Sequence, residues 1–262
     1  MIIISLYTLL FNSFLDPSHL WKATELKRKK TIYLFLLTSL IIGIPFFITN
    51  MNAVATIEKD ISRVTTKIPS FVIEDGKVNL KEPLEKALVV RTDSLNFIFD
   101  INNQYDELEK EKDMENTILN LLFTENSFTL LTNQVPINIP YKNAEGFTDT
   151  FFTSLLSRFS TKNTITVLTM IVLSFLSGMF ETAVRLLLFT LIGNLVSALF
   201  RVRLPFSVNW KIMMVASFVP TILFSLLNSI LIFPYGQTGL IGAISAFLYY
   251  KGIKIFIEKQ IK

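Results

Sequence analysis

Glu181 and Arg185 are the residues of this 262-residue chain whose types and spacing most suggest chemistry, because they place two opposite charges in an apolar run, 164–200, that holds no other charge. Four residues apart on a helix, they share one face and can pair. Charged side chains within a membrane span mark ion or substrate paths, so a path near Glu181 and Arg185 is one interpretation. The other is a boundary pair that avoids the cost of a lone charge.

Two amides are the other polar candidates inside apolar runs. Asn194 and Asn228 lie in the runs 163–200 and 212–233. Polar amides in membrane helices commonly bond to a neighbouring helix. We therefore expect them to join helices, with substrate contact as the alternative.

Small residues recur at helical spacing near the C-terminus. They form two pairs four residues apart: Gly239 with Ala243, and Gly242 with Ala246. Such pairs let helices approach closely. They predict tight packing, either within the chain or against a partner.

Near the N-terminus, the order Asp16-Pro17 predicts a helix start, with Asp16 as the cap and Pro17 at the first helical position. The chain has no cysteine and one histidine, His19, which excludes thiolate catalysis and Cys-ligated metal sites. Phosphate-loop, nucleophile-elbow, zinc-protease and dinucleotide motifs are missing. The acidic run 106–115 lacks the ligand spacing and glycine of a calcium loop. We therefore expect no catalytic, cofactor-binding or metal-binding residues, and not an enzyme.

The elements that carry these residues follow from hydropathy. The chain is 51% hydrophobic with a mean hydropathy of +0.49, which is unusual for a soluble domain. Apolar runs at 31–49, 163–200, 212–233 and 234–250 predict about four transmembrane helices. The run 164–200 is too long for one perpendicular crossing, so it crosses either once at length or twice as a hairpin.

Charge sets the expected orientation. Residues 51–162 hold 17 acidic and 12 basic residues, a net charge of −5, whereas basic residues flank the apolar runs. Cytoplasmic loops are rich in lysine and arginine, so we place 1–30 (an amphipathic segment and a basic cluster), 201–211 and 251–262 in the cytoplasm. A single crossing of 163–200 keeps all of these on one side.

Residues 50–162 are then an extracytoplasmic domain. Apolar residues at helical spacing open it, and Asp75-Gly76 between alternating runs predicts a hairpin. Strand candidates follow around 87–102 and 128–141, and 106–123 reads as a charged helix start passing into an apolar helix. The aromatic-rich stretch 147–159 suits the membrane interface. The expected fold class is an α-helical integral membrane protein with an inserted extracytoplasmic α+β domain that has a small antiparallel sheet.

Three stretches together resemble a known group: FNSFLDPSHLW with KRKK, IPSFVIEDGKVNL, and RLPFSVNWKIMMVASFVPTILFSLL. The chain resembles the bacterial multi-pass membrane proteins of unknown function often called maltodextrin (maltodextrose) utilization proteins, and is distantly similar to Yip-type proteins. The resemblance implies a Gram-positive plasma-membrane protein with an outside insert after the first span. It supplies no catalytic residues.

These observations favour a non-enzymatic membrane accessory or scaffold protein whose outside domain binds a partner or ligand, with the resemblance pointing to maltodextrin uptake. The alternative is a transporter or channel component with a path near Glu181 and Arg185. A membrane enzyme acting on lipid or cell-wall material comes last. The expected partners are the lipid bilayer and other membrane or envelope proteins. The sequence is also compatible with a homo-oligomer. Nucleic acid is not expected despite a pI near 9.1, because the bases flank apolar runs.

Overall fold

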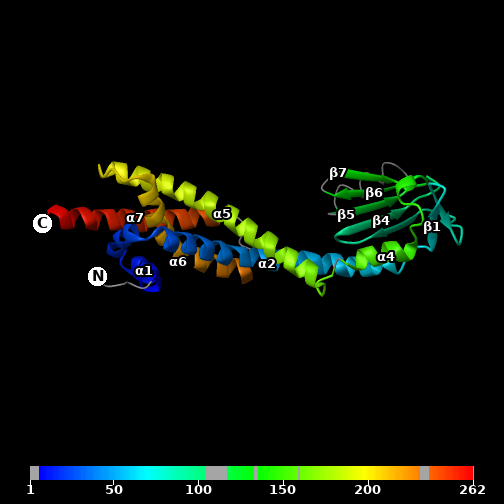
Figure 1. Ribbon diagram of the computed structural model, residues 1–262, viewed down its shortest axis with the longest axis horizontal. Coiled ribbons are helices and arrows are strands. Elements are labelled where there is room, and N and C mark those ends of the chain that lie inside the picture. The colour runs from blue at the N-terminus through cyan, green and yellow to red at the C-terminus, as the bar shows by residue number, and fades with distance from the viewer. Residues whose placement is uncertain are drawn as a thin grey trace. The chain divides into compact units, whose positions relative to one another are not determined.

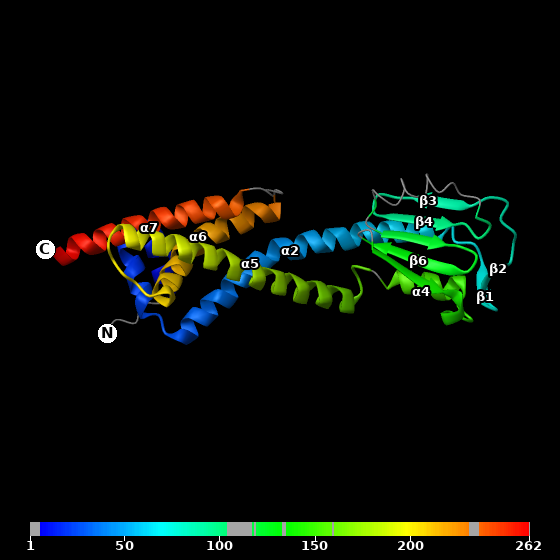
Figure 2. The same ribbon diagram turned by 90° about the horizontal axis from the view of Figure 1, so that it is seen from above.

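The computed structural model describes residues 6–103, 117, 119–132, 135–158, 160–230 and 236–261. The chain forms two structural units, and each is described by itself. The helical unit comprises residues 1–50 and 169–262, and the sheet unit comprises residues 51–168. Figures 1 and 2 show the helices of the first and the strands of the second.

Four helices of the described residues are long and apolar enough to cross a membrane. They are α2 (Arg28–Thr65), α5 (Thr164–Leu199), α6 (Phe206–Ile230) and α7 (Gln237–Ile261). The expected number of membrane-length helices is therefore confirmed. Residues 164–199 form one unbroken helix, so this run is not a hairpin. The expected loop 201–211 is shorter in the structure, since α6 begins at Phe206.

Helix α6 supplies the core of the helical unit. Residues 212–221 are all buried, as expected for a helix that is apolar all round and surrounded by other elements. It packs against α7, α1 (Leu6–Leu15) and the short 3₁₀ helix η1 (Pro17–Glu25).

The N-terminal elements belong to this packing. Asp16 caps η1 by accepting a hydrogen bond from the backbone N–H of Ser18 at 3.0 Å, with Pro17 at the first position, as the sequence predicts. The indole Nε1 of Trp21 donates to the carbonyl of Gly252 at 3.0 Å, and its ring stacks on Phe256 with centroids 3.9 Å apart. Helix α7 includes most of the expected tail, 251–262, because it runs to Ile261. Its contacts with Trp21 hold η1 against it.

The sheet unit contains two sheets. A hairpin pairs β1 (Phe71–Glu74) with β2 (Lys77–Leu80) around Asp75-Gly76, as predicted. The second sheet has the order β3-β4-β5-β6-β7. Its strands are β3 (Leu88–Arg91), β4 (Leu95–Phe99), β5 (Leu119–Phe123), β6 (Ser127–Thr132) and β7 (Val135–Pro140).

Two expectations about this sheet are wrong. Strands β4 and β5 pair in parallel, so the sheet is mixed rather than antiparallel. Residues 119–123 form β5, not the end of a helix, because this short apolar segment pairs on both sides, with β4 and with β6. The rest of the expected helix, including the acidic run 106–115, lies outside the described residues.

Phenylalanine fills the core of the sheet unit. Phe97, Phe99 and Phe123 are almost completely buried, and the rings of Phe99 and Phe123 stack 5.2 Å apart. Helix α4 (Asp149–Ser157) adds Phe152, whose ring meets Phe123 edge-on at 4.9 Å. Ile61 and Val64 of α2 complete the cluster, to which both helices contribute.

Two prolines make the β7 edge a poor template for a further strand. The N–H of Tyr141 donates to the carbonyl of Asn126, which places the odd-numbered residues of β7 in hydrogen-bonded pairs with β6. Pro136 and Pro140 therefore point their imide nitrogens outward and offer no donor there. Proline at a free edge prevents pairing with another chain, so we expect recognition by the sheet unit to use a side-chain surface.

Candidate functional site

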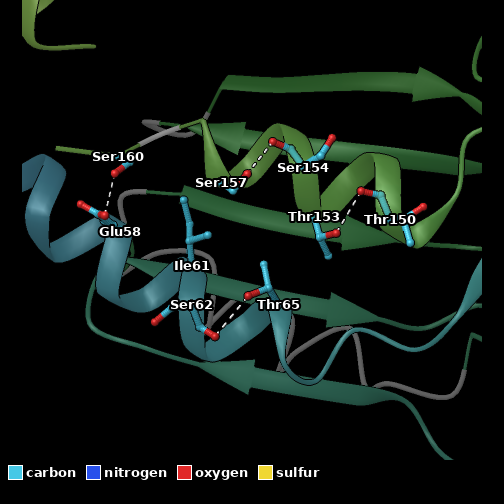
Figure 3. Close-up of a pocket in the computed structure, with 9 residues that line it drawn as sticks. All are labelled: Glu58, Ile61, Ser62, Thr65, Thr150, Thr153, Ser154, Ser157 and Ser160. Carbon is cyan, nitrogen blue, oxygen red and sulfur yellow. Dashed lines mark hydrogen bonds between the residues drawn. The ribbon is translucent and has the colours of Figure 1, made fainter. Parts of the chain in front are cut away.

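A groove lined by hydroxyl groups lies between α2 and α4 in the sheet unit (Figure 3). Its volume is about 450 Å³. Seven of its lining residues carry hydroxyls: Ser62, Thr65, Thr150, Thr153, Ser154, Ser157 and Ser160. Glu58 lies at one end, beside Ser160, and Ile61 supplies apolar surface.

The periodicity of α4 creates one wall of this groove. Thr150, Ser154 and Ser157 follow one another at helical spacing on one face, whereas Phe152 and Leu156 face the core. Thr148 fixes the start of the helix, because its hydroxyl accepts a hydrogen bond from the N–H of Phe151 at 3.2 Å. The polar stripe is therefore a consequence of the amphipathic pattern.

Most groove hydroxyls already donate their hydrogen to a carbonyl of their own helix. Ser154 Oγ donates to Phe151 O at 2.7 Å, and Ser157 Oγ to Ser154 O at 2.8 Å. Ser62, Thr65 and Thr153 make the same kind of bond. The oxygen lone pairs remain, so the groove presents hydrogen-bond acceptors. It suits a ligand rich in O–H or N–H donors.

Glu58 holds the segment that joins α4 to α5. Its carboxylate accepts hydrogen bonds from Ser160 Oγ at 2.7 Å, Thr161 N at 2.9 Å and Thr161 Oγ1 at 2.8 Å. These hydrogen bonds lower the pKa of Glu58 to about 2, and the bond from Ser160 has the largest effect. At neutral pH it is an ionised acceptor and too weak a base for proton abstraction.

The helical unit places the predicted pair beside a second hollow. Arg185 and Glu181 form an ion pair on α5, and both line a cavity of about 390 Å³ among α2, α5, α6 and the start of α7. Asn228 of α6 lines the same cavity. Three of the predicted polar residues therefore come together, but Asn194 is not among them.

Asn194 joins helices instead. Its side-chain oxygen accepts a hydrogen bond from Asn209 Nδ2 of α6, and Asn209 Oδ1 accepts one from the hydroxyl of Tyr249 on α7. Asn209 is fully buried. The sequence interpretation missed it because it assigned Asn209 to the loop 201–211. The signal was an amide near the start of an apolar run.

The small residues of α7 divide into two groups. A Cβ added to Gly242 would lie 2.8 Å from the ring of Phe189, so Gly242 permits close approach to α5. At Gly239, such an atom would have no described residue within 4 Å. With Ala243 and Ala246, these glycines line an apolar groove between α5 and α7.

Another close approach of backbones in the helical unit, between α2 and α5, was not predicted. A Cβ on Gly178 of α5 would lie 2.2 Å from Ser39 O and 2.9 Å from Gly43 N of α2. A Cβ on Gly43 would lie 3.1 Å from Ser174 O. Ser39 with Gly43, and Ser174 with Gly178, are each small residues four apart, so the signal was present in the sequence.

Among the described residues, no group of three or more His, Asp or Glu side chains is placed to hold a metal ion. The family model described as "Protein of unknown function (DUF1189)" matches residues 7–253, and the chain belongs to this family. No curated protein and no solved structure matches the chain.

Proposed function

We propose that this family member is a non-enzymatic membrane accessory protein whose sheet unit lies outside the cell and binds a hydroxyl-rich ligand. The observation that carries the proposal is the groove between α2 and α4, where seven hydroxyl-bearing residues line one surface. Binding of such a ligand requires a dense set of hydrogen-bond acceptors, and this surface offers one. Proton abstraction would require a base with a pKa near neutral, and Glu58, the one carboxylate among the described residues that line the groove, has a pKa lowered to about 2.

A saccharide matches the groove in chemical class. Sugar hydroxyls donate hydrogen bonds in closely spaced arrays, and the groove oxygens accept them. The resemblance to maltodextrin utilization proteins supplies one candidate, a linear glucose oligomer, and would place the protein beside sugar uptake in a Gram-positive plasma membrane. The expected orientation, with both termini in the cytoplasm, puts the groove on the side from which such a ligand arrives.

Calorimetric titration of maltohexaose into the full chain, reconstituted in nanodiscs, tests this proposal. We expect saturable binding that falls at least about tenfold in the Ser154→Ala/Ser157→Ala variant, since each lost hydrogen bond contributes about 1 kcal/mol. Thr56→Val is the matched control, because Thr56 also donates to its own helix (Asn52 O, 3.0 Å) and lies outside the groove. Equal binding by all three proteins would refute the groove as the site.

The alternative, a transporter or channel component, rests on a different observation. Glu181 and Arg185 line a cavity between helices of membrane length, and intramembrane charges are common in substrate paths. Flux of a labelled substrate through reconstituted protein, lost in Glu181→Ala, would favour this function. Absence of flux together with retained saccharide binding would favour the accessory function.

A further inference from the structure

The polar cavity beside Arg185 lies next to an apolar groove. The cavity has a volume of about 390 Å³, and the groove between α5 and α7 has about 550 Å³. Both are lined by Thr238 and Gly239 at the start of α7, so the two hollows adjoin there. A polar compartment joined to an apolar one fits a molecule with a polar head and an apolar chain.

Arg185 places a largely buried guanidinium beside the polar compartment. The residue is only 7% exposed, and its Nε is buried without a hydrogen-bond partner. One terminal nitrogen pairs with Glu181. A guanidinium carries five N–H groups, and a buried donor without an acceptor is costly. A ligand in the cavity that supplies acceptor oxygens to the terminal nitrogens of this guanidinium would lower the cost of burying its charge.

The first turn of α7 supplies further donors. Gly236, with φ +83°, precedes the helix, and none of the described residues accepts a hydrogen bond from the N–H of Thr238 or Gly239. The N-terminal N–H groups of a helix carry a partial positive charge and bind anionic oxygens, those of phosphate above all. None of the described residues lies within 4 Å of a Cβ built on Gly239, which leaves room for a ligand beside this turn.

The charges of the cavity limit which polar headgroup an amphipathic ligand can carry. Glu181 lines the same cavity and offsets Arg185, so a headgroup with only negative charge would face a carboxylate. A headgroup that carries both a phosphate and an ammonium gives each charge an opposite partner. The phosphate then meets Arg185 and the α7 N-terminus, and the ammonium meets Glu181.

The groove suits the chain of such a molecule. Leucines of α5, including Leu188, Leu191 and Leu195, form one wall, and Gly239, Ala243 and Ala246 of α7 form a low floor. Each buried methylene contributes about 0.8 kcal/mol. Small side chains on α7 leave the space that a longer residue would fill.

We propose that the helical unit binds one phospholipid with a zwitterionic phosphate-and-ammonium headgroup of the phosphatidylethanolamine type. The headgroup occupies the cavity of Glu181 and Arg185, and an acyl chain lies in the groove between α5 and α7. This inference is independent of saccharide binding by the sheet unit.

Native mass spectrometry of the full chain in mild detergent tests the proposal. We would titrate phosphatidylethanolamine, phosphatidylglycerol, diacylglycerol and soluble phosphoethanolamine. We expect one phosphatidylethanolamine per chain, bound at least tenfold more tightly than diacylglycerol and phosphatidylglycerol, and no retention of phosphoethanolamine. Equal retention of diacylglycerol would overturn the headgroup site. Tighter binding of phosphatidylglycerol would overturn the assignment of a zwitterionic headgroup. Retention of phosphoethanolamine would overturn the role of the groove.

Two variants locate the site. Arg185→Gln removes the charge, and Gly239→Leu fills the junction of the two hollows at a position with open space. Each should weaken phosphatidylethanolamine binding at least tenfold, whereas Arg203→Gln, which changes an exposed arginine outside both hollows, should leave it unchanged. Because the Cβ added in Gly239→Leu meets none of the described residues, this variant tests the site even where Arg185→Gln fails to fold. Unchanged binding in Gly239→Leu would refute the proposal.

Discussion

The two units differ in what the carboxylates of their long helices contact. In the sheet unit, Glu58 and Asp60 of α2 bond to other elements: Glu58 to Ser160 and Thr161, and Asp60 to the N–H and hydroxyl of Ser94 at 3.0 and 2.6 Å. In the helical unit, Glu181 pairs with Arg185 on its own helix. The first arrangement fixes one element against another, and the second does not.

The helical unit instead brings helices together through small residues and buried amides. Gly178 lies against the backbone of α2, and Asn209 bonds to α5 and α7. This difference suits the expected surroundings. Between membrane helices, close packing is the main source of attraction, whereas carboxylates bridge elements best where water meets them. An ion pair confined to one helix is then free to serve a ligand.

Gly178→Ala should break the helical unit most. The added Cβ would meet Ser39 O and Gly43 N at 2.2 and 2.9 Å, so α2 and α5 would have to separate. Overpacking of this kind costs roughly 3 kcal/mol. Far-UV circular dichroism of the full chain during thermal unfolding in detergent measures the loss. The matched control is Gly239→Ala, whose methyl enters open space; an equal loss in both variants would contradict the assigned contact.

Asp60→Ala should have the largest effect on the sheet unit. The Asp60 side chain is 2% exposed, and its loss leaves the N–H and hydroxyl of Ser94 without their acceptor. We expect a destabilisation of about 2 kcal/mol. Hydrogen–deuterium exchange at Ser94 and Leu95 reports it. Arg63→Gln, which removes the half-exposed partner of Asp60 at 3.6 Å, should change exchange little.

How far the sequence predicts these contacts depends on their range. The hairpin at Asp75-Gly76 and the cap at Asp16 are local, and both are present as predicted. The spacing of Glu181 and Arg185 likewise predicts their pairing. Residues 119–123 were misassigned because a short apolar run suits either a buried strand or a helix. Its parallel partner β4 lies 24 residues earlier, so that pairing depends on tertiary structure, whereas its antiparallel partner β6 follows after a short turn and was a local hairpin signal.

The groove between α2 and α4 was missed for the same reason. The serines and threonines of 148–157 are visible as a stripe, but the stretch 147–159 reads first as aromatic. Ser62 and Thr65 lie about 90 residues earlier, and only the fold places them beside α4. In the same way, the crossing at Gly43 and Gly178 needs two segments at once, although each carries its own pair of small residues.

Asn209→Leu tests whether a polar contact adds to packing in the helical unit. The substitution removes the bonds to Asn194 and Tyr249 and leaves both without their described partner. Hydrogen bonds between membrane helices contribute about 1 kcal/mol. We expect a correspondingly small loss in thermal stability in detergent. Ser229→Ala is the control, because the Ser229 hydroxyl returns to Ser225 O of its own helix. A loss as large as that of Gly178→Ala would reverse the ranking of packing over polar contacts.

Glu58→Gln removes at neutral pH the stabilisation that the ionised carboxylate provides, and it changes the response of the sheet unit to acid. The pKa of Glu58 is lowered to about 2 in the folded chain from 4.5. Its stabilising contribution is therefore fully present above about pH 4.5 and is lost as the pH falls towards 2. The pKa of Asp60 is also lowered: burial opposes this shift, and hydrogen bonds from Ser94 outweigh it. Asp60 therefore adds a loss of stability of the same sign.

In Glu58→Gln the decline of stability between pH 5 and pH 3 should be shallower but not abolished, as measured by hydrogen exchange of the segment 160–162 in the full chain. Glu82→Gln, at an exposed carboxylate of the same unit, should retain the parent slope. If Glu58→Gln also retained the parent slope, the hydrogen bonds from Ser160 and Thr161 would not stabilise the sheet unit. The contrast with Glu181, which pairs with Arg185 on its own helix, would then fail for Glu58.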